Sequence, residues 1–409
     1  MAIKHMATEA DTGHPGMQPA SRPAPRLASI DAYRGLVMLL MMAEVLAIGK
    51  MARAFPESAF WKLLHWQQSH VEWAGAVLHD MIQPSFSFLA GVSLPFAIAA
   101  RVARGQSGWA MFGHAAWRSL LLVALGIWLR SIGRPQTYFT FEDTLSQIGL
   151  GYIFLFLLGL HSMRVQWMAF VVICVGYWAA FALYPLPGLD FNWSVAGVPQ
   201  DWPHHAQGFA AHWNKNTNLA WAFDRWFLNL FPREKVFTNN GGGYATLSFI
   251  PTLATMILGL IAGGWLRSNA TTPQKLARFC IAGMVGIVLG LALDWLGICP
   301  NVKRIWTPGW VLFSGGWCFL SLAAFHAVVD VKNLRAWAFP LIVIGANAIA
   351  AYLIAHLFEH FLIESLNTNL GWLLNPLMPY DPFARGALVL FIFWLILFWM
   401  YRGKIFLKV

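Results

Sequence analysis

Long apolar runs separated by short polar segments fill most of the chain after residue 29. A helix needs about 20 apolar residues to cross the ~30 Å hydrocarbon core of a bilayer, and about ten runs approach that length. The predicted spans are 30–49, 75–100, 113–132, 144–162, 167–186, 245–266, 277–297, 309–328, 338–358 and 386–403. We therefore expect an all-α fold, a polytopic membrane helix bundle with about ten transmembrane helices.

Three polar stretches interrupt this pattern. Residues 1–29 are rich in Pro, Ala, Ser and Gly and lack the long apolar core of a signal peptide, so they are expected to form a disordered cytoplasmic tail. The remainder, 30–409, is predicted to be one transmembrane domain. Residues 187–244 and 359–385 are predicted to be two long loops on the same side of the membrane.

The composition agrees with a membrane protein, because 58% of the residues are hydrophobic and only 11% are charged. Soluble domains carry about 25% charged residues. The net charge of +10 is scattered between apolar runs, which favours contact with anionic lipid or an anionic ligand over nucleic acid. Most Lys and Arg residues lie in segments on the side of the N-terminus, so the positive-inside rule predicts an N-in and C-in topology.

Candidate chemistry is concentrated in "HVEWAGAVLHD", at the start of the second span. His70 is either an interface residue or a functional one, since imidazole accepts protons near neutral pH and can also carry an acyl group. Asp80 lies ten residues later, about 15 Å away along a straight helix. If the chain turns between them, the carboxylate can orient the imidazole ring. The alternative is that Asp80 caps a helix.

Other polar groups at membrane depth each have a structural and a functional interpretation. Asp31 and Arg34 are spaced to pair on one helical face. Gln147 and Asn347 can hydrogen-bond between helices. Arg118 can reach lipid phosphate or bind a ligand phosphate. No GxGxxG, Walker, HExxH or GxSxG motif is present, and we expect no metal.

Several segments together resemble a known family. "RLASIDAYRGLVMLLMMAEV" and "HVEWAGAVLHDMIQPSFSFLAGVSLPFAIA" resemble the first two core spans of the heparan-α-glucosaminide N-acetyltransferase family. Further matches follow in the family's order: "AWRSLLLVALGI", "DTLSQIGLGY", "FDRWFLN", "PTLATMILGLIAG", "PNVKRIWTPGWVLFSGG", "VVDVKNL" and "GANAIAAYLIAH". The chain lacks the extra lumenal domain of the lysosomal enzyme, so it resembles the shorter bacterial members.

The resemblance implies an enzyme that takes acetyl from cytoplasmic acetyl-CoA and delivers it to a glucosamine-type amino sugar on the far side of the membrane. The family's active-site histidine and nearby aspartate map onto His70 and Asp80. A family asparagine maps near Glu44 or Val45, so the sequence departs from the pattern there. The expected location is the cell inner (plasma) membrane, with His70 toward the periplasmic side, and a homodimer is a reasonable assembly.

The resulting hypothesis assigns a role to each group of residues. His70 is the general base or a transient acetyl carrier, and Asp80 orients it. Glu44, Trp73, Gln147 and Asn347 are candidates for binding the acceptor. The candidates for binding the phosphates of CoA are Arg101, Arg104, Arg118, Arg267, Lys275 and Arg278. The alternatives are a proton-coupled transporter with a relay of His70, Asp80 and Glu44, and an O-acyltransferase acting on sugar hydroxyls.

Overall fold

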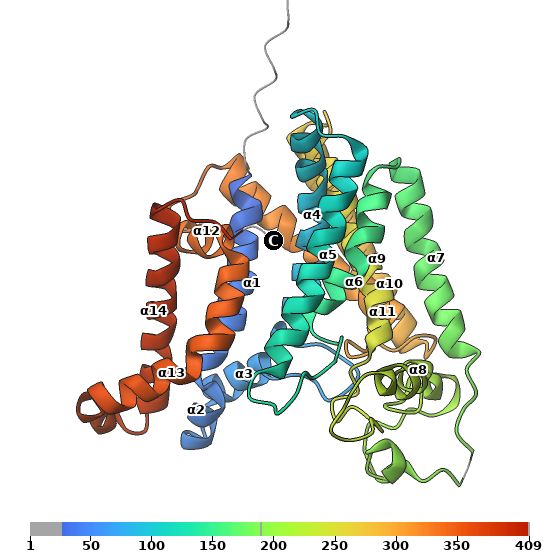
Figure 1. Cartoon of the computed structure of the whole chain (residues 1–409), viewed down its shortest axis with the longest axis horizontal. Coiled ribbons are helices and arrows are strands. Elements are labelled where there is room, and N and C mark those ends of the chain that lie inside the picture. Colours follow the sequence, from blue (N-terminus) through green and yellow to red (C-terminus); the bar gives the residue numbers. More distant parts are fainter. Residues whose placement is uncertain (1–26, 189, 408–409) are drawn as a thin grey trace, which may run out of the picture.

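The computed structural model describes residues 27–188 and 190–407, which form helices joined by loops (Figure 1). The predicted tail lies outside the described residues up to residue 26, and helix α1 already begins at Ala28. Ten helices correspond to the ten predicted spans. They are α1 (Ala28–Met42), α4 (Ile82–Val102), α5 (Gly108–Ser131), α6 (Thr144–Gly159), α7 (Met163–Ala182), α9 (Phe249–Arg267), α10 (Thr272–Trp295), α11 (Pro308–Phe325), α13 (Ala348–Leu374) and α14 (Asp381–Arg402).

Fewer than ten of these helices are regular membrane spans. Among the described residues, 8 helices are long and apolar enough to cross a membrane, or up to 9 if a bent pair counts as one span. That pair is the first predicted span, where the segment ending at Leu46 meets α2 (Ile48–Ala54) at 46°. Helix α6 has 16 residues, about 24 Å of helix, which is short of the ~30 Å core. The predicted polytopic helical bundle is confirmed, but the described residues contain fewer candidate membrane spans than the ten predicted.

The predicted loop at 359–385 is wrong, because α13 continues to Leu374. Leu362, Leu366 and Leu370 recur at helical spacing and pack into the cluster that α13 shares with α1 and α14. Most of the polar residues between them, including Glu364, are exposed. The segment from residue 359 to Leu374 is therefore part of an amphipathic helix, although its polar residues alone predicted a loop. The ninth predicted span is also divided, because Asn347 separates α12 (Phe339–Ala346) from α13.

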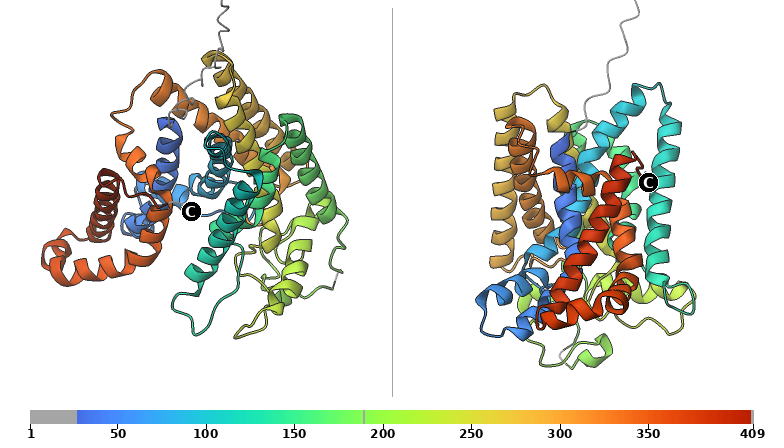
Figure 2. Two further views of the ribbon diagram at one scale, coloured as in Figure 1. Left: turned by 45° about the horizontal axis from the view of Figure 1, so that its top comes forward. Right: turned by 90° about the vertical axis from the view of Figure 1, so that its left-hand side faces the viewer.

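Residues 187–244 do form a long connection, as predicted, with short 3-10 turns and one helix, α8 (Leu219–Phe227). In Figure 1, this segment lies at the lower edge with α2 and α3 (Ala59–Gln68), opposite the start of α1. We call this end the loop face. The opposite end is the terminal face, where α1 begins and α14 ends. Both views in Figure 2 show the long helices running between the two faces.

Glycines allow close approach where α4 crosses α9 and where α1 crosses α12. A Cβ atom on Gly91 of α4 would lie 1.9 Å from the Met256 carbonyl oxygen, and one on Gly259 of α9 would lie 1.9 Å from the Phe88 oxygen. At the crossing of α1 and α12, a Cβ on Gly35 would lie 1.8 Å from a backbone oxygen. Small residues let membrane helices approach this closely. These crossings position α1 and α4, which lead to the candidate site.

Candidate active site

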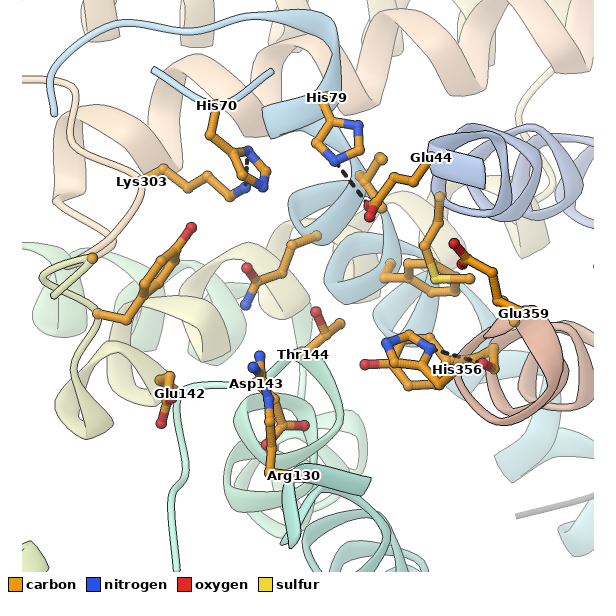
Figure 3. Close-up of a pocket in the computed structure, with 18 of the residues that line it drawn as sticks. Glu44, His70, His79, Arg130, Glu142, Asp143, Thr144, Lys303, His356 and Glu359 are labelled. Atoms are coloured by element: carbon orange, nitrogen blue, oxygen red, sulfur yellow. Dashed lines mark hydrogen bonds and ion pairs between the residues drawn. The ribbon is translucent and has the colours of Figure 1, made fainter. Parts of the chain in front are cut away.

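A cavity of about 720 Å³ lies at the loop face. It is bounded on one side by α1 and α13, and on the other by the start of α4, the end of α5 and the start of α6. Figure 3 shows His70, His79, Lys303 and Glu44 along one side of it. The ionisable side chains that line it are Glu44, His70, His79, Arg130, Glu142, Asp143, Tyr244, Lys303, Tyr352, His356, Glu359 and His360.

His70 and Asp80 are in direct contact, because the chain turns between them. Helix α3 ends at Gln68, and a loop leads to the 3-10 turn Leu78–Met81 that carries Asp80. The Nδ1 atom of His70 lies 2.7 Å from Oδ1 of Asp80. The other carboxylate oxygen accepts hydrogen bonds from the backbone N–H groups of Val71 at 3.4 Å and Val77 at 3.3 Å. Asp80 therefore holds the loop closed and orients the imidazole.

This contact defines the reactive nitrogen of His70. A carboxylate can only accept hydrogen bonds, so Nδ1 of a neutral His70 carries the proton that it donates to Asp80. The lone pair then resides on Nε2, and His70 lines the cavity. A base or nucleophile needs this arrangement, in which a third group orients the ring and stabilises its protonated form.

Lys303 completes this cluster. Its Nζ atom donates to Oδ1 of Asp80 at 3.1 Å and lies 3.4 Å from Nδ1 of His70. Its side chain is only 6% exposed. Burial lowers the pKa of Lys303 from its usual range, and the carboxylate of Asp80 acts in the opposite direction. Sequence reasoning did not assign it a role, although "PNVKRIWTPGW" places a Lys–Arg pair directly before a membrane span.

The backbone around Lys303 is joined to the His70 loop. The Gly75 N–H donates to the Asn301 carbonyl oxygen at 3.0 Å, beside an antiparallel bridge between Ala74 and Val302. Arg304 donates to the Val71 carbonyl oxygen at 3.0 Å. The two segments, far apart in sequence, therefore form one unit that sets the position of Lys303 relative to His70.

A second carboxylate–imidazole pair lies beside the first. Nε2 of His79 is 3.0 Å from Oε1 of Glu44, and the rings of His79 and His70 are 4.7 Å apart (Figure 3). Glu44 lines the cavity, on the 3-10 turn Ala43–Leu46 that follows α1. His79 was not assigned a role from the sequence, because the family resemblance did not extend to it.

Comparison with known proteins shows which enzymes have sequences similar to this chain. No protein-family model matches the chain. It is 26% identical over 426 residues to heparan-alpha-glucosaminide N-acetyltransferase from Homo sapiens, covering 94% of this chain and 60% of that protein. It is 24% identical over 438 residues to the protein of that name from Mus musculus, covering 96% of this chain and 62% of that protein. These two similarities support membership of the heparan-alpha-glucosaminide N-acetyltransferase family. The chain spans about 60% of the length of these relatives.

Three of the predicted acceptor-binding residues do not line the cavity. Trp73 is buried and donates its indole N–H to the Trp213 carbonyl oxygen at 3.0 Å. Gln147 is buried and donates to the Phe141 carbonyl oxygen at 2.7 Å. Asn347 donates to the Ile405 carbonyl oxygen at 2.8 Å, at the break between α12 and α13. Their observed contacts are structural.

The six predicted CoA-binding residues lie toward the terminal face, and two of them share a pocket. Arg101 and Arg118 line a cavity of about 270 Å³ together with His114 and Tyr152. Arg118 donates to the Tyr152 hydroxyl at 3.1 Å, and its buried Nε has no hydrogen-bond partner among the described residues. The others lie outside this pocket. Arg104, Arg267 and Lys275 donate to the backbone oxygens of Ala100, Pro95 and Leu266, and Arg278 is exposed.

Proposed function

We propose that the chain is a transmembrane acetyltransferase that moves acetyl from acetyl-CoA to an amino sugar. The observation that carries this proposal is the His70–Asp80 contact of 2.7 Å at the wall of the 720 Å³ cavity. The names of the two relatives supply the reaction class. The described residues contain no group of three His, Cys, Asp or Glu side chains placed to hold a metal ion, and the absence of a metal stays a prediction.

The proposed transfer uses Nε2 of His70 as a general base. It accepts a proton from the acceptor amine as the amine nitrogen attacks the thioester carbonyl carbon. The new C–N bond forms, the C–S bond breaks, and the proton passes from His70 to the departing thiolate of CoA. Asp80 stabilises the imidazolium formed in between. In the alternative sequence, Nε2 first takes the acetyl group and then gives it to the amine.

The donor is proposed to enter from the terminal face. The pocket around Arg101 and Arg118 contains cationic groups and no carboxylate among its lining residues, which suits the phosphates of CoA. Helix α4 lines both this pocket, through Leu94 and Arg101, and the loop-face cavity, through Gln83. It therefore provides a continuous wall along which the pantetheine arm can extend toward His70.

The membrane orientation follows from the same proposal. The terminal face carries the basic residues of the short connections, including Arg101, Arg104 and Arg267, and is proposed to face the cytoplasm, where acetyl-CoA is made available. The loop face then points outward, and the cavity receives the acceptor from that side. Tyr244 and Tyr352 offer aromatic surface to a sugar ring, and Glu142 and Glu359 offer acceptors for its hydroxyl and amine groups.

The decisive test is acetyl transfer by purified protein to a panel of amino sugars, with the products identified by mass spectrometry. His70→Ala is expected to lower the rate by about 10³-fold, because the general base is lost. It should retain the thermal stabilisation by acetyl-CoA, since the donor's phosphates bind elsewhere. His204→Ala is the matched control, because His204 pairs with Glu72 outside the cavity.

Three outcomes would contradict the proposal. Full activity of His70→Ala would remove His70 from the reaction. A wild-type protein that gains no thermal stability from acetyl-CoA and releases no free thiol would instead favour the transporter. Acetylated products from sugars that lack an amine, with none from amino sugars, would identify an O-acyltransferase.

A further inference from the structure

The Glu44–His79 pair connects the candidate catalytic histidine with solvent. His79 is 7% exposed and its ring lies 4.7 Å from that of His70. Its Nε2 atom lies 3.0 Å from the carboxylate of Glu44, which is 57% exposed. The pair therefore extends from a buried imidazole at the wall of the cavity to a carboxylate in contact with water.

The end of α3 fixes both members of this pair. The side chain of Gln68 donates to the Ala43 carbonyl oxygen at 2.7 Å, directly before Glu44. The Oε1 atom of Gln67 accepts the Leu78 N–H at 2.8 Å, directly before His79. Gln68 and Gln67 thus hold the backbone segments that carry Glu44 and His79, respectively. These two contacts do not involve Asp80 or Lys303, although His79 and Asp80 share the 3-10 turn Leu78–Met81.

The proposed reaction has a proton requirement that one imidazole does not meet. An amino-sugar acceptor arrives mainly as an ammonium group, which has no lone pair with which to attack a thioester. It must lose one proton before the attack and a second as the amide forms. The thiolate of CoA takes up one of them. For each acetyl group transferred, one proton must therefore leave the site for solvent.

We propose that His79 and Glu44 remove the first of these protons, so that the site is built for an ammonium acceptor. Nε2–H of His79 donates to Glu44, which leaves the lone pair on Nδ1. Nδ1 accepts the proton of the ammonium group while the Nε2 proton moves to Glu44 and then to water. His70 takes the second proton and returns it to the thiolate. The ammonium form and acetyl-CoA thus give the amide, CoA thiol and one released proton.

Other charged groups face this pair, and they shape any pH profile. They are His70 and Asp80 from the preceding loop and turn, Lys303 before α11, Tyr352, His356, Glu359 and His360 from α13, and Arg130, Glu142, Asp143 and Tyr244 across the cavity. The test therefore compares each variant with wild type at every pH, so that these common contributions cancel.

The inference rests on the proposed function, and its test is the pH dependence of acetyl transfer to glucosamine by the full chain. Glu44→Gln and His79→Gln are expected to lower the rate at least tenfold at pH 6.5, because the ammonium form is no longer deprotonated. At pH 9, where the free amine predominates, both variants should come within about twofold of wild type. Glu72→Gln is the matched control, because Glu72 pairs with His204 at 3.3 Å on the same face but outside the cavity.

The outcomes separate this inference from the function beneath it. Unchanged profiles in Glu44→Gln and His79→Gln would overturn the proton route while leaving the acetyltransferase intact. An equal loss at every pH would also overturn it, because that result indicates a purely structural role. A wild-type protein that acetylates no amine at any pH would instead refute the proposed function.

Discussion

The loop-face cavity and the terminal-face pocket use ionisable residues in different ways. In the loop-face cavity, side chains pair with one another: Asp80 contacts His70 and Lys303, and Glu44 contacts His79. In the terminal-face pocket, Arg118 donates to the Tyr152 hydroxyl through Nη1 and lies over the Tyr152 ring, and its buried Nε lacks a hydrogen-bond partner among the described residues.

This difference separates a preorganised site from a site that awaits a charged ligand. Groups held by mutual ion pairs keep a fixed orientation when no ligand is bound, which suits proton transfer and transition-state stabilisation. Arg118 is half-buried, and its unpartnered Nε gains a hydrogen bond when an anion binds. The comparison predicts that substitutions at the loop face lower the rate of the reaction, whereas substitutions at the terminal face weaken donor binding.

After His70, the largest effect is expected at Lys303. Lys303→Gln removes the cation from a pair that is 6% and 1% exposed, which leaves the carboxylate of Asp80 with His70 and two backbone N–H groups. Breaking a buried pair costs about 3–5 kcal/mol, and the remaining partners of Asp80 favour the lower value. A misplaced His70 is expected to lower the rate of acetyl transfer by about 10²-fold.

The measurements for Lys303→Gln are kcat and the thermal unfolding midpoint, with Lys215→Gln as the control. Lys215 is a loop-face lysine that lies over the Trp202 ring and does not line the cavity. An unchanged unfolding midpoint and an unchanged kcat for Lys303→Gln would show that the ion pair organises nothing, and the contrast between the two ends would fail.

The sequence identified the membrane class and the His70–Asp80 pair for different reasons. Apolar runs of about 20 residues are a local signal, so most spans were predicted directly. The pairing of His70 with Asp80 was one of two alternatives on local grounds, and the family resemblance favoured it. The structure shows the turn that makes the contact possible.

The rest of the site depends on contacts that no local pattern contains. Lys303 reaches Asp80 across 223 positions, through a segment fastened to the His70 loop. His79 is one residue from Asp80, yet its role depends on Glu44, which α3 brings within reach. Trp73 and Gln147 show that polar or aromatic side chains predicted near a site can also hydrogen-bond to backbone oxygens away from the cavity.

A smaller effect is expected at the other end of the bundle. Arg118→Gln removes the proposed charge-assisted contact to a phosphate, which would be worth about 1.5–3 kcal/mol, and should raise KM for acetyl-CoA roughly tenfold or more. The value of kcat should change little, because the loop-face groups are untouched. Arg164→Gln at the start of α7 is the control, because Arg164 is an exposed arginine of the same face outside the pocket. A fall in kcat at constant KM would contradict the assignment of this pocket to the donor.

The smallest effect is expected at Asp224, a second buried aspartate of the loop face that can be compared with Asp80. Asp224 in α8 is 2% exposed, much like Asp80, but it has a different set of partners. One carboxylate oxygen accepts the Thr246 N–H at 2.9 Å, and the other has no hydrogen-bond partner among the described residues. Burial raises the pKa of Asp224 to about 7. Burial alone therefore does not make an aspartate part of the site; the imidazole and ammonium partners of Asp80 do.

Asp224→Asn is expected to change the pH dependence of stability and leave acetyl transfer unaltered. The folded-state pKa of about 7 lies above the ordinary value of 3.8, so the protonated carboxyl favours the folded state. That contribution is full below about pH 4 and is lost as the pH rises through 7. Wild type should therefore lose more thermal stability than Asp224→Asn between pH 5 and pH 8, by a few degrees, because the amide oxygen still accepts the Thr246 N–H without acquiring a charge. Parallel unfolding midpoints for the two proteins across this range would mean that Asp224 is solvated or paired in the folded protein, and the contrast with Asp80 would no longer hold.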